Sequence, residues 1–385
     1  HEHNGQEHVI IIDKSKPIPA RIEDVLERLA LRPQDADVKH IFNNSAFHGF
    51  SASIKSHCLD LLGNMSDVAI VEQAVALTSA KASDYTLRGN SPWGLQTIST
   101  IAPPSGSAEE MDFKYAYADP TLGRGADIYL IDTGIYTKHV VFNGRAKQLW
   151  SYDGSNGDSD GHGTHTAGTA GGTDVGVAPG ANVFGLKALD SNGGGLSSNI
   201  VAAIDVVVRR HDERKAAGGD FRGSVMSMSL ASSTPVESIR RAIDAAISAG
   251  VHVSVAAGNS AEDACGVSPA SSGGANGRAI TVGAVDMRGR RASFSNYGSC
   301  VDLYAPGVDI ISAWTPLASG GRHTDLVNSM DGTSMAAPHV TGIIAYAMAA
   351  DSKLAASPAR MKQWLLANAL RIGDGLLLAN NGVHA

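Results

Sequence analysis

Three residues stand in glycine-rich surroundings where a side chain could act on a substrate. Asp132 follows an apolar run and precedes Thr-Gly, His162 has a glycine on each side, and Ser334 precedes a long apolar segment. A serine hydroxyl is a weak nucleophile unless an imidazole takes its proton, and a carboxylate orients that imidazole and stabilises its cation. Together the residues predict a nucleophile, a base and an orienting acid. Taken singly, each would be better explained as a turn or helix-capping residue.

The elements that must position these residues follow an α/β pattern. Apolar runs alternate with segments of helical spacing, which predicts a mainly parallel sheet with helices on its faces. Asp132 directly follows one run, at the carboxyl end of a strand, where such sheets carry functional residues. The predicted strands are 126–131, 183–188, 225–230 and 251–256, and the predicted helices are 199–210 and 236–249.

Residues 1–80 follow a different pattern. A β-branched run at 9–12, two segments of helical spacing, a β-like region around Gly49 between them and a closing strand at 68–71 predict the order β-α-β-β-α-β, with the region around Gly49 counted as two strands. This order predicts a small α+β ferredoxin-like unit. Residues 81–92 are polar without a clear period and predict a linker.

The three clusters resemble the signature motifs of subtilisin-like serine proteases, most closely the fungal branch of proteinase K and the vacuolar cerevisin-type enzymes. The motifs are Ile131-Asp-Thr-Gly134, His162-Gly-Thr-His165 and Gly332-Thr-Ser-Met-Ala-Ala-Pro-His339, in the family's order of Asp, His and Ser. The resemblance implies a serine endopeptidase with its catalytic domain at 93–385, built on a mostly parallel sheet flanked by helices. It also implies that residues 1–80 are a propeptide, first a folding template and then an inhibitor, with processing between Leu77 and Asn90.

The resemblance further implies a role for each matching residue. Ser334 would be acylated by the peptide carbonyl, His162 would act as general base and acid, and Asp132 would orient the imidazole. Asn259 would donate an N–H to the oxyanion, together with the backbone N–H of Ser334. Substrate would bind as an added β-strand. The residues expected to bind it are Gly194, Gly195, Leu196, Ser229, Leu230, Ala231, Ala256 and Gly258.

Among the departures from the family pattern, one concerns the substrate pocket and another the charge near the catalytic imidazole. The second substrate segment continues with Ala231 and Ser232, where relatives usually have two glycines. Their side chains should narrow the pocket for the residue before the scissile bond, so we expect large aromatic residues to be disfavoured there. Asp331 lies three residues before the expected nucleophile. Its carboxylate either raises the pKa of the catalytic imidazole or is a solvated loop charge.

Cysteines and metals bear on the compartment and on cofactors. The three cysteines cannot form a disulfide scaffold or, alone, a four-ligand zinc site, and their spacing is equally compatible with buried thiols. The resemblance implies that Cys265 pairs with Cys300, which fits a secretory-route protein that is vacuolar or extracellular. The resemblance implies that catalysis requires no cofactor. It leaves a structural calcium site possible at Asp302, with backbone carbonyls near Gly277 and Ala279.

Composition narrows the partners. The formal charge is −7, from 31 Lys and Arg against 38 Asp and Glu, without a basic block, which argues against a nucleic-acid partner. No apolar run approaches the ~18 residues of a membrane span, which argues against a membrane partner. We expect a monomer whose partners are peptide or protein substrates and its own propeptide.

Two other functions stay open on the sequence alone. A metal-dependent hydrolase could use the cluster Asp153, Asp158, Asp160, His162 and His165. Against this reading, the His-x-x-His spacing lacks the glutamate of a zincin motif, and Ser334 would have no role. The second alternative is a catalytically weak binding protein, held shut by its propeptide or disabled by Asp331 and Ala231.

Overall fold

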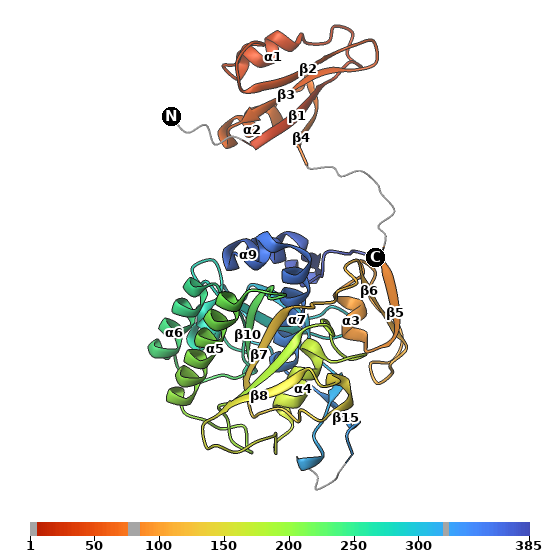
Figure 1. Cartoon of the computed structure of the whole chain (residues 1–385). Helices are drawn as coiled ribbons and strands as arrows, with labels where there is room; N and C mark the ends of the chain where they lie inside the picture. The colour runs from red at the N-terminus through yellow and green to blue at the C-terminus, as the bar shows by residue number, and fades with distance from the viewer. Residues whose placement is uncertain (1–5, 76–84, 319–322) are drawn as a thin grey trace. The chain divides into compact units, whose positions relative to one another are not determined.

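The computed structural model describes residues 6–75, 85–318 and 323–385. The chain divides into two compact units, His1–Ala82 and Ser83–Ala385 (Figure 1). Each unit has its own hydrophobic core. The division falls close to the end of the small unit expected from the sequence.

The first unit is an antiparallel sheet with both helices packed into one core. Its elements are β1 (Gln6–Ile12), α1 (Ile22–Arg28), β2 (Val38–Asn43), β3 (His48–Ile54), α2 (Ser56–Gly63) and β4 (Val68–Gln73). The strand order is β2-β3-β1-β4. Ile10 and Phe50 of the sheet share the core with Leu26 of α1 and Leu62 of α2. The element order is the one expected for residues 1–80, while the role of this unit as a propeptide stays a prediction.

A long sheet forms the centre of the second unit, in the order β16-β17-β13-β12-β11-β10-β7-β9-β8. Neighbouring strands from β17 to β8 are parallel, and β16 pairs with β17 in the antiparallel sense. The strands are β7 (Ala126–Asp132), β8 (Ala146–Ser151), β9 (Asn182–Lys187), β10 (Gly223–Met228), β11 (His252–Ala256), β12 (Ile280–Val285), β13 (Leu303–Pro306), β16 (Leu370–Ile372) and β17 (Leu376–Leu378). The predicted mostly parallel α/β architecture is confirmed.

Helices cover both faces of this sheet (Figure 1). They are α3 (Trp93–Thr97), α4 (His162–Gly171), α5 (Ser197–Ala217), α6 (Glu237–Ala249), α7 (Thr333–Ala350), α8 (Ser352–Ala355) and α9 (Pro358–Asn368). Ile128 and Leu130 of β7 pack in the core that contains α4 and α7, whereas Tyr129 and Ile131 pack in the core that contains α5 and α6. Because β7 is buried on both faces, its sequence is a continuous apolar run.

Two strand pairs lie outside the long sheet: β5 (Thr86–Ser91) with β6 (Phe113–Tyr117), and β14 (Ile310–Ala313) with β15 (Val327–Met330). Residues 86–91 were expected in the linker at 81–92, but they form β5. Arg88 anchors this strand, because its guanidinium donates to the carbonyl of Gly176 at 3.1 Å and lies over the Tyr115 ring. Such long-range contacts leave no periodic pattern in the sequence.

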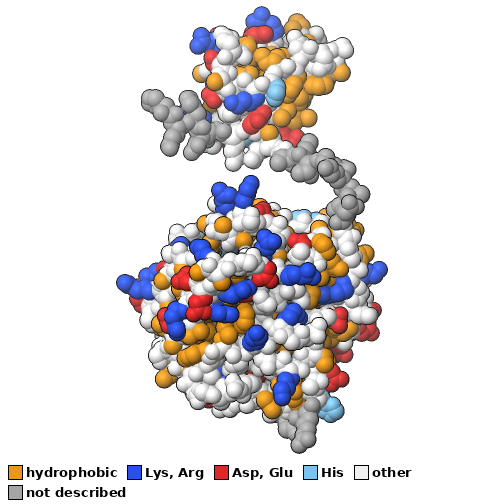
Figure 2. Space-filling view, viewed as in Figure 1, with side chains coloured by type: hydrophobic (Ala, Val, Ile, Leu, Met, Phe, Trp, Pro, Cys, Tyr) orange, Lys and Arg blue, Asp and Glu red, His pale blue; other side chains and the backbone are white. Residues whose placement is uncertain are grey.

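Charges of opposite sign are intermixed on the helical side of the second unit, as Figure 2 shows. Arg209, Arg240 and Arg241 each pair with an acidic residue three or four positions away on the same helix. Across the described part of the chain, we find no helix with both the length and the apolar character needed to span a membrane.

Candidate active site

Asp132 and His162 are joined by a hydrogen bond between the ends of two elements. Asp132 is the last residue of β7, and His162 is the first residue of α4. The distance from Nδ1 of His162 to Oδ1 of Asp132 is 2.7 Å. The same oxygen accepts the backbone N–H of Thr133 at 2.7 Å, and the Asp132 side chain is buried. An imidazole held in this way carries a proton on Nδ1 and presents Nε2 as the proton acceptor.

The loop before α4 is organised by Asp158, which is fully buried. Its carboxylate accepts the N–H of Gly161 at 2.8 Å and the N–H and hydroxyl of Thr164 at 2.8 and 2.6 Å. It also accepts the hydroxyl of Thr133 at 2.9 Å. Asp158 therefore ties the end of β7 to the start of α4.

The electrostatic surroundings of His162 favour its protonated form. Burial opposes a charge on the ring, but the carboxylates of Asp132, Asp160 and Asp158 outweigh it and raise the pKa of His162 above its ordinary value. Asp160 also accepts the backbone N–H of His162 at 3.0 Å. The imidazole therefore becomes protonated at a higher pH than a free histidine.

Ser334 lies in the first turn of α7, beside the end of β10. Its Oγ donates to the carbonyl of Ser229 at 3.2 Å, and Oγ of Ser229 donates to the carbonyl of Ser334 at 2.9 Å. β10 is the parallel neighbour of β7, with Ser227 opposite Leu130, so continuation of this register brings Ser229 beside Asp132. The hydroxyl of Ser334 and the Asp132–His162 pair thus belong to the same edge of the sheet, at the carboxyl ends of its strands.

Asn259 is oriented by Thr333. Its Oδ1 accepts both the backbone N–H and the hydroxyl of Thr333, each at 2.8 Å. The hydroxyl oxygen of Thr333 in turn accepts the N–H of Gly258 at 3.0 Å. With Oδ1 engaged, the amide nitrogen of the exposed Asn259 is the end of the side chain that can meet a substrate. Because Thr333 directly precedes Ser334, these hydrogen bonds fix the position of the Asn259 amide with respect to the start of α7.

Asn296, which the sequence analysis did not select, shapes the turn that carries Asn259. Its Nδ2 donates to the carbonyl of Ala257 at 2.9 Å, and its Oδ1 accepts the N–H groups of Ser260 and Glu262 at 3.0 and 3.1 Å. The side chain is buried. The available signal was a polar Ser-Phe-Ser-Asn-Tyr-Gly stretch outside every predicted element, which by itself does not reveal its partner.

A cavity of about 510 Å³ opens beside His162. Its lining includes both segments expected to bind substrate, through Gly194, Gly195, Leu196, Ser229, Leu230 and Ala231. Leu196 is 69% exposed, so its side chain is open to contact. Ala256 and Gly258 do not line this cavity but belong to the end of β11 and the turn that follows. The volume and the mixed lining are those of a ligand site.

Ala231 and Ser232, the two residues expected to narrow the pocket, have different surroundings. Ala231 is exposed and its side chain lines the cavity. Ser232 is tied to Ser268, because its N–H donates to the Ser268 carbonyl at 2.8 Å and its hydroxyl lies 3.3 Å from the same oxygen. Ser232 and Ser268 also line the cavity, so the segment after β10 is anchored at the cavity wall itself.

The carboxylate of Asp331 is engaged by the backbone of the loop after β13. Its Oδ1 accepts the backbone N–H of Asp309 at 2.7 Å. Burial and the charges of Asp331 and Glu109 raise the pKa of Asp309. These contacts favour the interpretation of Asp331 as a loop charge.

The side chains of the metal-hydrolase alternative do not converge. The carboxylate oxygens of Asp158 already accept hydrogen bonds from Thr133, Gly161 and Thr164. Nε2 of His165 lies 2.8 Å from the carbonyl oxygen of Ile310. Burial lowers the pKa of His165 to about 4. Asp153 accepts the hydroxyl of Ser155 at 2.7 Å. Over the described ranges, we find no group of three or more His, Cys, Asp or Glu residues arranged to hold a metal ion.

The cysteines pair as the family resemblance implied. Cys265 and Cys300, 35 positions apart, form a disulfide, and Cys58 in the first unit is a free thiol. Asp302, the candidate calcium ligand, instead contacts the ammonium of Lys362 at 2.8 Å.

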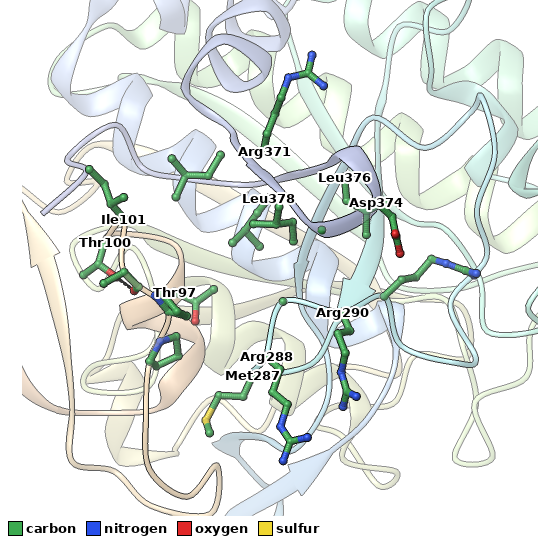
Figure 3. Close-up of a pocket in the computed structure, with 18 residues that line it drawn as sticks. Thr97, Thr100, Ile101, Met287, Arg288, Arg290, Arg371, Asp374, Leu376 and Leu378 are labelled. Carbon is green, nitrogen blue, oxygen red and sulfur yellow. Dashed lines mark hydrogen bonds between the residues drawn. The ribbon is translucent and has the colours of Figure 1, made fainter.

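A second cavity, of about 400 Å³, lies away from these residues (Figure 3). Met287 and Arg288 come from the connection after β12, and Leu376 and Leu378 come from β17. Leu376 and Leu378 face the cavity, whereas Arg371 extends away from it. None of the residues expected to act in catalysis lines this cavity.

Comparisons with known proteins agree with the motifs and the architecture. Residues 123–383 match the model of the Subtilase family. The subtilisin-like serine protease Cur l 4.0101 of Cochliobolus lunatus is 36% identical over 97% of this chain and 71% of its own length. The subtilisin-like serine protease AsES of Sarocladium strictum is 41% identical over 87% of this chain and 78% of its own length.

Solved structures lead to the same family. The crystal structure of a cold adapted subtilisin-like serine proteinase superposes with a TM-score of 0.64 at 34% identity, covering 76% of this chain and 99% of that one. The family match covers all three motifs, and both relatives are described as subtilisin-like serine proteases. The chain therefore belongs to the subtilase family and is a subtilisin-like serine endopeptidase.

Proposed function

We propose that the chain cleaves peptide bonds through an acyl-enzyme intermediate on Ser334. Oγ leaves the carbonyl of Ser229 and attacks the substrate carbonyl carbon, while Nε2 of His162 takes its proton. Asp132 stabilises the imidazolium, which then protonates the leaving amine. A water molecule activated by the same ring hydrolyses the ester. The observation that carries this proposal is the 2.7 Å hydrogen bond between Asp132 and His162.

The developing oxyanion is stabilised by donors that are already in place. Nδ2 of Asn259 and the backbone N–H of Ser334 are the proposed pair. The Ser334 N–H belongs to the first turn of α7, where helical N–H groups lack intrahelical partners and the helix dipole favours negative charge. Since Thr333 already holds Asn259, little reorganisation is required as charge develops.

The peptide substrate is proposed to lie as a strand between two segments, 194–196 and 229–231. Main-chain hydrogen bonds would supply affinity, and the cavity beside His162 would select side chains. Ala256 and Gly258 would border the pocket for the residue before the scissile bond. The placement of 194–196 and 229–231 around one cavity supports this arrangement.

The first unit is proposed to be a propeptide that templates folding and then inhibits until it is degraded. Its separate hydrophobic core supports an independent folding unit. Processing was expected between Leu77 and Asn90, a range whose first part, residues 77–84, lies outside the described residues. Because 86–91 form β5 in the second unit, we propose that the bond precedes Thr86.

Processing is tested on the full chain with Ser334→Ala as the control. We expect the parent to release its N-terminal segment. N-terminal sequencing should then show that the processed protein begins between residues 77 and 86. The alanine variant should keep its full length. Cleavage that proceeds equally in both proteins would contradict self-processing.

The compartment and the assembly state are also part of the proposal. The Cys265–Cys300 disulfide supports an oxidising, secretory-route destination, either vacuolar or extracellular. A monomer is proposed, which sedimentation equilibrium of the processed protein would test. Catalysis is proposed to need no cofactor.

The decisive experiment for the mechanism is mass spectrometry after treatment with a fluorophosphonate. We expect one adduct, on the peptide that contains Ser334, with loss of casein hydrolysis, and no adduct in Ser334→Ala. EDTA should leave labelling intact. Loss of activity with EDTA and no adduct would favour a metal-dependent hydrolase, and propeptide-free protein without turnover on casein would favour a binding protein.

A further inference from the structure

The ammonium of Lys362 lies within a cage of oxygen atoms. From α9, its Nζ reaches the carbonyl oxygens of Gly274, Gly277 and Ala279 at 2.8, 3.0 and 2.9 Å. The fourth oxygen is Oδ1 of Asp302, at 2.8 Å. Both charged side chains are largely buried, with 14% of Lys362 and 4% of Asp302 exposed. An ammonium has three N–H bonds, so one of them is shared between two of the four oxygens.

The cage is built by the backbone rather than by Lys362. The second carboxylate oxygen of Asp302 accepts the N–H groups of Gly274 and Thr281 at 3.0 and 2.9 Å. A β-carbon at Gly277 would lie 2.2 Å from the carbonyl oxygen of Gly273. Gly274 has a φ of +73°, in the left-handed region that favours glycine. The loop 273–279 is therefore confined to a conformation that turns several carbonyls inward.

The oxygens suit a hard cation, but the site as built does not fit calcium. A carboxylate and backbone carbonyls are typical calcium ligands, and the sequence analysis named Asp302, Gly277 and Ala279 for that role. Calcium binds oxygen at about 2.3–2.6 Å, whereas the contacts to Nζ are those of N–H···O hydrogen bonds. The ammonium occupies the point where these oxygens converge, so Lys362 and a calcium ion cannot both be present.

We propose that Lys362 supplies the cation of this site in place of a divalent metal. The stabilisation from a bound metal depends on its free concentration, whereas a covalently attached ammonium is present whenever α9 is docked. The stability of loop 273–279 is therefore independent of calcium. It depends instead on the packing of the C-terminal helix against the catalytic unit. On this proposal, Asp302 pairs with Lys362 rather than with the calcium ion that the sequence analysis left possible.

The test is thermal unfolding of the full chain in a Ser334→Ala background, which prevents autolysis. All four tryptophans lie in the second unit, so their fluorescence reports on that unit alone. The variants are Lys362→Ala, which empties the cage, and Lys362→Met, which fills it without a charge. Lys353→Ala, at an exposed position of α8, is the control. Each is measured in EDTA, in millimolar calcium and in millimolar magnesium.

We expect both Lys362 variants to unfold at least about 5 °C below the parent in EDTA, because Asp302 is left as an unpaired buried charge. Calcium should restore much of the loss in Lys362→Ala but not in Lys362→Met, and magnesium should restore little because it demands a stricter geometry. The parent and Lys353→Ala should respond equally little to calcium.

Three results would overturn the proposal. The first is a Lys362→Ala midpoint equal to that of the parent in EDTA. The second is a calcium-induced rise in the parent as large as that in Lys362→Ala. The third is a Lys362→Ala protein that is destabilised but whose unfolding midpoint does not rise with calcium, since calcium would then not replace the Lys362 ammonium. If the Lys362→Ala protein cannot be purified in folded form, Lys362→Gln is measured by the same criteria. If Lys362→Ala folds only when calcium is present during purification, that result would support the proposal.

Discussion

Thr333 donates two hydrogen bonds to Oδ1 of Asn259, one from its backbone and one from its hydroxyl, both at 2.8 Å. The residue before the proposed nucleophile thus sets the orientation of the proposed oxyanion donor. An amide held by its oxygen keeps its N–H groups for the substrate, so binding of the oxyanion requires no prior rotation of the side chain.

The first prediction concerns this pair. Asn259→Ala should lower kcat by about 10²–10³-fold with little change in KM, because the lost donor acts only on the transition state. Thr333→Val keeps the backbone contact and should give a smaller loss, about tenfold. Steady-state kinetics on one peptide substrate measure both. A large rise in KM with unchanged kcat in Asn259→Ala would place Asn259 in ground-state binding instead.

The second prediction concerns the hydrogen bond from His162 to Asp132. Asp132→Asn should lower kcat by about 10⁴-fold, because an amide can donate to Nδ1 and so place the proton on Nε2, where it blocks acceptance from Ser334. The folded state should be kept, which circular dichroism checks. Activity within tenfold of the parent would contradict the assigned role of Asp132.

The third prediction concerns pH. Carboxylates near His162 raise its pKa, and only the neutral imidazole can accept the proton of Ser334. The acid limb of kcat/KM should therefore lie at a higher pH than for an ordinary histidine. Asp160→Asn removes one of these charges and should move the limb to lower pH, while its amide oxygen can still accept the N–H of His162.

Asp331→Asn is the control for the pH experiment. Its carboxylate bonds to the backbone of Asp309, so we expect its profile to overlay that of the parent. A shift for Asp331→Asn as large as that for Asp160→Asn would restore the electrostatic role considered for Asp331.

The fourth prediction concerns specificity. The methyl group of Ala231 lines the cavity, so Ala231→Gly should raise the ratio of kcat/KM for Phe over Ala before the scissile bond, by about 10-fold if a methyl-sized obstruction is removed. Matched peptides that differ only at this residue measure the ratio. Equal cleavage after Phe and Ala by the parent would argue against a narrowed pocket.

The fifth prediction concerns the disulfide. The cross-link closes a segment of 35 residues, so Cys265→Ser with Cys300→Ser should lower the free energy of unfolding by about 3–4 kcal/mol through the entropy of the unfolded chain. Urea titration of Ser334→Ala proteins, followed by tryptophan fluorescence, measures the loss. Cys58→Ser is the control, since Cys58 is unpaired in the other unit, and an equal loss there would contradict the assignment.

Local patterns in the sequence were sufficient to predict the α/β class, and the resemblance of three motifs to one family led to the proposed catalytic residues. Strand β7 shows as a continuous apolar run because it is buried on both faces, and α6 shows because its apolar residues recur at helical spacing. The motifs around Asp132, His162 and Ser334 could be compared with a known family because each is a short contiguous run of residues.

Only the tertiary structure decided the features that depend on partners far away in the chain. The contacts that hold strand β5 are distant in sequence, since Arg88 binds near Gly176, and the segment was therefore expected to be a linker. Asn296 was missed because the turn that it holds, beyond β11, is also distant in sequence. The cation at Asp302 comes from Lys362, whose place in the sequence carries no sign of the loop it enters. Hydrogen bonds across such separations depend on how helices and loops pack, and packing is a property of the whole chain rather than of any segment.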